Sequence, residues 1–349
     1  MEKHPDVKKG SRTKPGKTRL IDVAELAGVS IATASRALSK PHLVTTQLRT
    51  QVSLAVEQLN YRPDGVARAL SLGHNRTIGA IVPTLGVAVF ATGVECLQSR
   101  LDELGYTLLL GNSQYDPRKE LNQIRAFVEH SVAGLILVGG DMSEEALTCL
   151  RGLDLPIVCT YMHTSRYGFP SVGIDNFNVT KRLVTYLIAL GHRRFGIVSN
   201  TALPNARSSA RRDGAIKAIV GATTGACSYV VAEVHETSVA QGRQAYRRIF
   251  DPDPLVTAVV CTSDALALGM LAECKDQNRA VPGHVSITGY DDMEFVAHTD
   301  PPLTSVRVPA QEISNQAVDL LMAMIAGTPV KMSTEVEAEI IFRDSVSPP

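Results

Sequence analysis

Residues 20–38 read LIDVAELAGVSIATASRAL, and this stretch predicts two short helices joined by a tight turn. Gly28 interrupts the helical spacing, and Ser30 is a residue type that caps the start of a helix. Small and apolar residues recur at helical spacing on both sides of the break: Leu20, Val23, Ala24, Leu26 and Ala27 before it, and Ala34, Ala37 and Leu38 after it.

A third helix is predicted from Thr45, which can cap it, to Leu59. Asn60-Tyr61-Arg62-Pro63 then ends it. Three short helices with a glycine turn between the first two are typical of a helix-turn-helix unit. We therefore assign residues 18–63 to a helix-turn-helix domain and residues 64–75 to one further short helix and a linker.

From Arg76 onward, short runs rich in Val, Ile and Leu alternate with amphipathic stretches of helical length. Strands are predicted at Ile78–Val82, Thr107–Leu110, Gly134–Val138, Ile157–Cys159, Phe195–Val198, Ala258–Cys261 and Val285–Thr288. Helical patterns include Val94–Leu104, Glu120–His130, Thr180–Leu190 and Ala265–Gln277. This alternation predicts two parallel α/β sheets with helices on both faces, over residues 76–349.

The charges are unevenly distributed although the net charge is zero. Residues 1–74 hold 12 Lys and Arg against 6 Asp and Glu, which leaves 23 against 29 for the rest of the chain. A basic head on an acidic body indicates a nucleic-acid contact at one end. Residues 1–17 by themselves are better explained as a disordered, solvated basic tail.

Several classes of protein are disfavoured by what the sequence lacks. No apolar run reaches the roughly 18 residues that span a bilayer, and the basic start does not look like a secretory signal, so we expect a cytoplasmic protein. The six cysteines lack zinc-site spacing and are interpreted as buried, reduced thiols, with no metal and no cofactor expected. Neither a G-x-G-x-x-G turn, a Walker lysine loop nor a G-x-S-x-G elbow is found, so no enzyme is predicted. His192, after Gly191, is interpreted as a helix C-terminal cap.

From about Leu20 to Arg343 the chain resembles the lactose-repressor family of bacterial transcription regulators. The residues that carry the resemblance follow the order of the family's motifs: Asp22-Val23-Ala24, Ala27-Gly28-Val29-Ser30, Thr33-Ala34-Ser35-Arg36, Leu59-Asn60-Tyr61-Arg62-Pro63 with Ala67 and Leu70, Asp175-Asn176, Leu190-Gly191-His192, Ser263 to Gly269, Gly289-Tyr290-Asp291-Asp292 and Pro301 to Val306. The resemblance implies an all-α helix-turn-helix head and a hinge helix, followed by a two-lobed, periplasmic-binding-protein-like α/β domain for effector binding and dimerisation.

At the head, the residues that would contact DNA are Ser30, Ile31, Ala32, Thr33, Ser35, Arg36, Tyr61 and Leu70. Arg36 can bind the O6 and N7 of a guanine, and Ile31 can pack on thymine methyl groups. By resemblance, Leu70 wedges between base pairs in the minor groove. Alternatively, Ile31 packs in the small core, Arg36 is a solvated charge and Leu70 is an ordinary linker residue. Asp64 departs from the neutral residue of many members, so no phosphate contact is assigned there.

In the body, the resemblance places Phe90, Asp175, Arg211, Ser263 and Asp291 at the effector cleft. A guanidinium and a carboxylate can hold the vicinal hydroxyls of a sugar or polyol. The alternatives are a turn cap for Asp291, a surface basic patch for Arg211 with its neighbours, and a loop-structuring role for Asp175.

Three departures from the family limit the effector to a class. The loop Val87-Ala88-Val89-Phe90 keeps only its phenylalanine as a pocket wall, Thr237 stands near the place of a common aromatic ring, and Ser263 replaces a common asparagine. The chain also has no Trp for stacking. The expected effector is a sugar, polyol or sugar acid, phosphorylated sugars included.

These observations predict a homodimeric transcription regulator that binds a pseudo-palindromic double-stranded operator and responds to a small molecule. Repression of carbohydrate or related catabolic genes, relieved by an inducer, is the expected activity. The alternatives are a sugar-binding sensor module without its own operator and a non-specific nucleoid protein.

Overall fold

The computed structural model describes residues 18–39, 41–61, 75–139, 141–164, 166–201, 205–223 and 225–349. The chain divides into two compact units, Met1–Asn75 and Arg76–Pro349. The predicted basic tail, the hinge helix and the wedge residue Leu70 lie outside the described residues.

The described part of the first unit consists of short helices around a small core. These are α1 (Leu20–Leu26), α2 (Ile31–Ser39), the 3-10 turn η1 (Pro41–Leu43) and α3 (Thr46–Gln58). Gly28 takes a positive φ of 66°, which a glycine adopts at little cost, and the chain turns there between α1 and α2. As predicted, Ser30 and Thr45 cap the two following helices through their side-chain oxygens. The core consists of Val23, Ala24, Ala34, Ala37, Val52 and Ala55.

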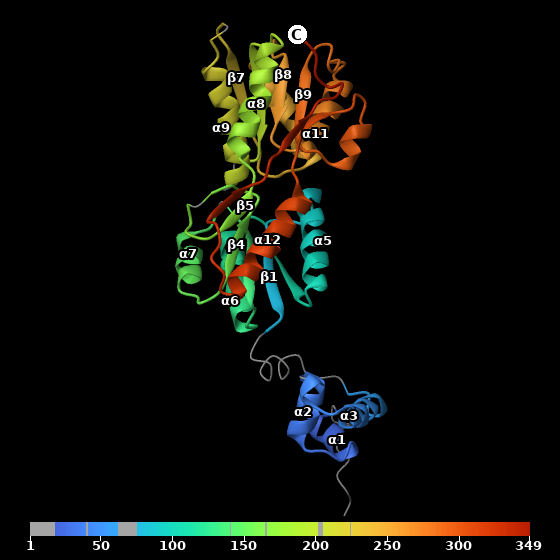
Figure 1. The fold of residues 1–349 in the computed structure, drawn as a ribbon. Coiled ribbons are helices and arrows are strands. Elements are labelled where there is room, and N and C mark those ends of the chain that lie inside the picture. Colours follow the sequence, from blue (N-terminus) through green and yellow to red (C-terminus); the bar gives the residue numbers. More distant parts are fainter. Residues whose placement is uncertain are drawn as a thin grey trace, which may run out of the picture. The chain divides into compact units, whose positions relative to one another are not determined.

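The second unit consists of two lobes, each built on a six-stranded sheet (Figure 1). The first sheet has the order β11-β5-β4-β3-β1-β2, with the strands β1 (Thr77–Val82), β2 (Thr107–Asn112), β3 (Gly134–Val138), β4 (Ile157–Thr160), β5 (Ser171–Gly173) and β11 (Ser333–Glu335). The second has the order β12-β10-β9-β8-β6-β7, with β6 (Arg194–Ser199), β7 (Ser228–Glu233), β8 (Ala258–Cys261), β9 (Ser286–Asp291), β10 (Thr304–Arg307) and β12 (Glu339–Ile341).

Helices cover both faces of each sheet. In the first lobe they are α5 (Ala88–Glu103) and α12 (Ala310–Ile325) on one face, and α6 (Pro117–Glu129) and α7 (Glu144–Arg151) on the other. In the second lobe they are α8 (Asn176–Ala189) and α9 (Ala206–Val220), and α10 (Val239–Phe250) and α11 (Asp264–Asp276). A further 3-10 turn, η2 (Glu294–His298), precedes β10. The central strands read as continuous apolar runs because both of their faces are buried.

The chain passes between the lobes at three places. Residues 174–175 join β5 to α8, residues 308–309 join β10 to α12, and residues 336–338 join β11 to β12. The lobes are therefore assembled from segments far apart in the sequence, and Figure 1 shows α12 in the lobe of β1 and β4 although it follows the strands of the other lobe.

The predicted two-sheet α/β architecture and all seven predicted strands are confirmed. One correction concerns direction, because β12 runs antiparallel to β10 whereas the other paired strands are parallel. Of the six cysteines, Cys159, Cys261 and Cys274 are buried, the others are half-buried, and all are free thiols. Over the described ranges, no helix is both long and apolar enough to cross a membrane.

Candidate functional site

The first candidate site is the outward face of α2. Ser30 accepts a hydrogen bond from the backbone N–H of Thr33 at 3.1 Å, and the two hydroxyls are 2.9 Å apart. This cap fixes the start of the helix, the part that a recognition helix presents to base edges. Ala34 and Ala37 face the core, whereas Ala32 and Arg36, which are four residues apart, lie together on an exposed face of the helix.

The exposure of these side chains decides between the two interpretations of Ile31. Its side chain is 49% exposed, so it is not a core residue of the head. Ala32 and Arg36 are also exposed, and Thr33 and Ser35 are half-buried. Tyr61 is half-buried and packs against the helical core. The head therefore presents apolar, hydroxyl and guanidinium groups on one surface.

The second candidate site is a cavity of about 430 Å³ between the lobes of the second unit. The first lobe contributes Val87, Val89, Phe90, Tyr115 and Tyr161, the second contributes Asn205, Arg207, Ser208, Arg211, Thr237, Thr262, Ser263 and Asp291, and Val308 comes from a crossover. Four of the five predicted effector residues, Phe90, Arg211, Ser263 and Asp291, are brought together here.

Asp175 is the predicted effector residue that lies elsewhere. Its carboxylate caps α8, accepting hydrogen bonds from the backbone N–H of Asn178 at 2.9 Å and from its side chain at 2.6 Å. It lines a different surface hollow together with Arg182 and Glu335. The alternative of a structural role for Asp175 agrees with this placement.

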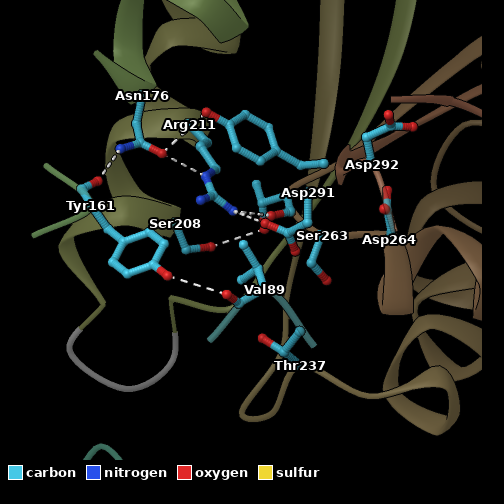
Figure 2. Close-up of polar contacts among 12 residues, drawn as sticks. Val89, Tyr161, Asn176, Ser208, Arg211, Thr237, Ser263, Asp264, Asp291 and Asp292 are labelled. Carbon is cyan, nitrogen blue, oxygen red and sulfur yellow. Dashed lines mark hydrogen bonds and ion pairs between the residues drawn. The ribbon is translucent and has the colours of Figure 1, made fainter. Parts of the chain in front are cut away.

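Arg211 is the centre of a buried polar network on the cavity wall (Figure 2). Its Nε donates to Asn176 Oδ1 at 2.8 Å, and its Nη1 donates to the carbonyl of Thr262 at 2.8 Å and lies 3.7 Å from Asp291 Oδ1. The guanidinium also lies 3.6 Å from the ring centre of Tyr290, whose hydroxyl donates to Asn176. Arg211 is therefore an anchored cleft residue and not part of a surface patch.

Asp291 has an unusual backbone and a perturbed carboxyl group. Its φ of 112° lies in a region that favours glycine, at the end of β9. Burial raises its pKa to about 6, against the opposing effect of Arg211 and Arg207. Strained backbone conformations at non-glycine residues are concentrated at ligand sites, and so are carboxyl groups with raised pKa values. Asp291 has both features.

Ser263, and not the neighbouring Asp264, caps α11. Ser263 accepts the backbone N–H of Leu266 at 3.3 Å, and it also lines the cavity. The carboxylate of Asp264 accepts hydrogen bonds from the backbone N–H of Met293 and the hydroxyl of Ser305. The predicted C-terminal cap at His192 is made by its backbone, whose N–H donates to the carbonyl of Leu187 in the last turn of α8 at 3.2 Å. Its buried ring forms hydrogen bonds with Thr257 and with the carbonyl of Ser347, and burial lowers its pKa.

A second cavity of about 430 Å³ adjoins the first through Tyr115 and Arg207, which line both. Its lining includes Glu120 and Asp141. Burial, followed by the charge of Asp141, raises the pKa of Glu120 to about 7, and Arg207 opposes the shift. The sequence interpretation missed Arg207, although its spacing of four residues from Arg211 places both on one helix face.

Two regions of the chain match described families. Residues 19–64 match the bacterial regulatory proteins of the lacI family, and residues 184–346 match a periplasmic binding protein-like domain. The chain is 30% identical over 336 residues to the HTH-type transcriptional repressor PurR of Haemophilus influenzae strain PittEE, covering 93% of this chain and 97% of that protein. The chain belongs to the lacI family.

Further comparisons agree with membership of the lacI family. The HTH-type transcriptional regulator GntR of Pseudomonas aeruginosa is 30% identical over 340 residues, covering 97% of this chain and 98% of that protein. The crystal structure of the Lac repressor dimer bound to operator and the anti-inducer ONPF has a TM-score of 0.85 at 22% identity, covering 95% and 100% of the two chains, and shows the same fold. The protein is thus a DNA-binding transcription regulator of the lacI family with an effector-binding domain. The relatives named above are also regulators.

Proposed function

We propose that this protein is a cytoplasmic, non-enzymatic repressor that binds a pseudo-palindromic operator as a homodimer, with one α2 helix in the major groove of each half-site. The observation that carries the proposal is the surface of α2, where Ile31, Ala32 and Arg36 face outward from a helix whose start is fixed by Ser30. Arg36 supplies guanine recognition, and Ile31 and Ala32 supply contact with thymine methyl groups. Ser30, Thr33, Ser35 and Tyr61 supply hydroxyls for the phosphates, and Leu70 is the proposed minor-groove wedge.

The cleft is the proposed effector site, and the genes controlled are carbohydrate or related catabolic genes. The support is chemical: Arg211 and Asp291 are a buried donor and acceptor pair beside Ser263 and the ring of Phe90. Such a combination holds the hydroxyls and an apolar edge of a small polyhydroxylated compound. Effector binding relieves repression by stabilising one arrangement of the lobes over another.

Selection of bound duplexes from a random DNA library, with purified full-length protein, tests the proposed function. Enrichment of a palindrome is expected, and a flexible pyrimidine–purine step at its centre would agree with a wedge at Leu70. An Arg36→Ala protein in the same selection should lose preference at one symmetric pair of positions. If no sequence is enriched, with or without cell extract as a source of effector, the result would support a sensor module without its own operator. Salt-dependent DNA binding with no preferred sequence would instead support a nucleoid protein.

A further inference from the structure

Arg207 is a buried cation with no carboxylate partner among the residues that the structure describes. Its side chain, on the first turn of α9, is 5% exposed. Among the described residues, its one hydrogen bond runs from Nη1 to the carbonyl of Gly139 at 2.9 Å, and its guanidinium lies 5.5 Å from the ring centre of Phe90. No described carboxylate lies within 4.0 Å of it. A guanidinium has five N–H donors, so most of its donors are left for another partner.

The other two arginines of α9 differ from Arg207 in this respect. Arg211 lies 3.7 Å from Asp291, and Arg212 forms ion pairs with Asp213 at 2.9 Å and Glu233 at 3.0 Å. The charged side chains that line the interlobe cavity are Arg207, Arg211 and Asp291. Since Asp291 faces Arg211, the cavity retains one positive charge.

The acidic groups of the adjoining cavity do not fill the role of a partner for Arg207. Asp141 accepts the backbone N–H of Ala206 at 2.6 Å, at the start of α9. Asp116 caps α6 by accepting the backbone N–H groups of Arg118 and Lys119. Glu120 is half-buried, and burial raises its pKa to about 7, which reduces its negative charge at neutral pH. These three carboxylates line the adjoining cavity and not the interlobe cavity.

The starts of two helices lie at the interlobe cavity, where Asn205, the cap of α9, and Ser263, the cap of α11, both line it. The N-terminal end of a helix favours anions, but the start of α9 already binds the carboxylate of Asp141, and Asp264 lies in the first turn of α11. The positive charge of the cavity therefore comes from its guanidinium groups.

We propose that the effector is an anionic polyhydroxylated compound whose carboxylate or phosphate group binds Arg207, while its hydroxyls contact Arg211, Ser263 and Asp291. This inference rests on the proposed function of the cleft and narrows its ligand class. Arginine binds both carboxylates and phosphates through paired hydrogen bonds.

Calorimetric titration of the full-length protein with matched compounds tests this proposal. The probes are the aldonates of glucose, galactose and xylose, the corresponding alditols, and the corresponding terminal sugar phosphates. At least one aldonate or sugar phosphate should bind about tenfold or more tightly than the corresponding alditol. Whether that compound is an aldonate or a phosphate identifies the anionic group that the site prefers.

Two variants assign the effect to Arg207. Arg207→Gln should weaken binding of the anionic probe about tenfold to a hundredfold, and Arg207→Lys should restore part of it. Arg212→Gln, on the same helix but paired outside the cavity, should bind the probe as the parent does. Thermal unfolding of each variant without ligand checks that it is folded.

Either of two results would overturn the proposal. One is that no anionic probe binds more tightly than the corresponding alditol. The other is that Arg207→Gln weakens the binding of the anionic probe and of its alditol by the same factor. Enrichment of an operator by the same protein preparation would show that the regulator function stands even if the anionic effector is rejected.

Discussion

Replacing Asp264 by asparagine removes a buried carboxyl group from behind the cleft while nearly preserving its shape. The side chain is 1% exposed and lies beyond Asp291, on the side away from Arg211 (Figure 2). Its Oδ2 accepts the backbone N–H of Met293 at 2.8 Å, and its Oδ1 lies 2.6 Å from the hydroxyl oxygen of Ser305. Burial, followed by the charge of Asp291, raises the pKa of Asp264 to about 8, although both hydrogen bonds oppose the shift.

The sign of the pH dependence follows from the direction of this shift. Because the pKa of Asp264 is higher in the folded chain than the ordinary 3.8, the folded chain holds one more proton than the unfolded chain between these two values. The free energy of unfolding therefore falls as pH rises through that window, by about 1.4 kcal/mol per pH unit, and the loss is complete above the folded pKa. From pH 5.5 to pH 7 the contribution of this one group is about 2 kcal/mol.

Asparagine reproduces the protonated form of this side chain. Its carbonyl oxygen can accept from Met293 as Oδ2 does, and its amide can donate to the oxygen of Ser305 once that hydroxyl, which donates to the carboxylate in the parent, rotates away. Asp264→Asn should therefore unfold at higher urea concentration than the parent at pH 7 and lack this part of the pH dependence. Since the chain has no Trp, far-ultraviolet circular dichroism is the suitable signal.

The informative quantity is the difference in unfolding free energy between parent and variant at each pH, because titrating groups that do not interact with Asp264 contribute equally to both. Asp276→Asn is the matched control, since Asp276 is an exposed carboxylate on the same helix. It should leave the pH dependence as in the parent. Parallel curves for the parent and Asp264→Asn would refute the assignment of a proton to Asp264.

Three further outcomes are expected. Arg36→Ala should weaken operator binding by about 1–3 kcal/mol and relax one base position, as measured by competition with single-base operator variants. Gly214→Ala places a Cβ 2.2 Å from a backbone carbonyl oxygen of α8 and should lower the unfolding free energy by about 1–3 kcal/mol, whereas Gly283→Ala, whose nearest neighbour is 3.5 Å away, should be tolerated in the same thermal-unfolding assay. Arg211→Met leaves buried acceptors without their donor and should lower stability by about 3–5 kcal/mol, a result that equal urea midpoints of variant and parent would contradict.

The sequence predicted the elements whose identity depends on local pattern. Helix α2 could be placed because Gly28 and Ser30 mark its start chemically, and the central strands because they are buried on both faces. The short strands β5, β11 and β12 have three residues each and no distinctive pattern. They exist through hydrogen bonds to neighbours far away in the chain, which a local pattern does not contain.

The site residues divide in the same way. Arg211, Ser263 and Asp291 were placed at the cleft by motif, but the motif does not distinguish Asp175, which caps a helix, from residues that line the cavity. Arg207 was overlooked among neighbouring arginines because its burial depends on a contact with Gly139 in the other lobe. Sequence spacing puts it on the face of Arg211, but only the folded arrangement of the two lobes shows that it is buried.

The cleft network connects ligand chemistry to the segments that join the lobes. Asn176, which accepts from Arg211, is the first residue of α8 after one crossover, and the backbone N–H of Val308, in a second crossover, donates to the carbonyl of Asp291 at 3.4 Å. A compound that binds Arg211 and Asp291 therefore acts on groups fixed to two of the three connections. A ligand shifts the arrangement of the lobes only by as much as its affinity differs between arrangements. A compound can contact Arg211 of the second lobe and Phe90 of the first lobe at the same time only when the two lobes are close together. A compound that makes both contacts therefore favours closure of the lobes, whereas a compound that contacts one lobe does not.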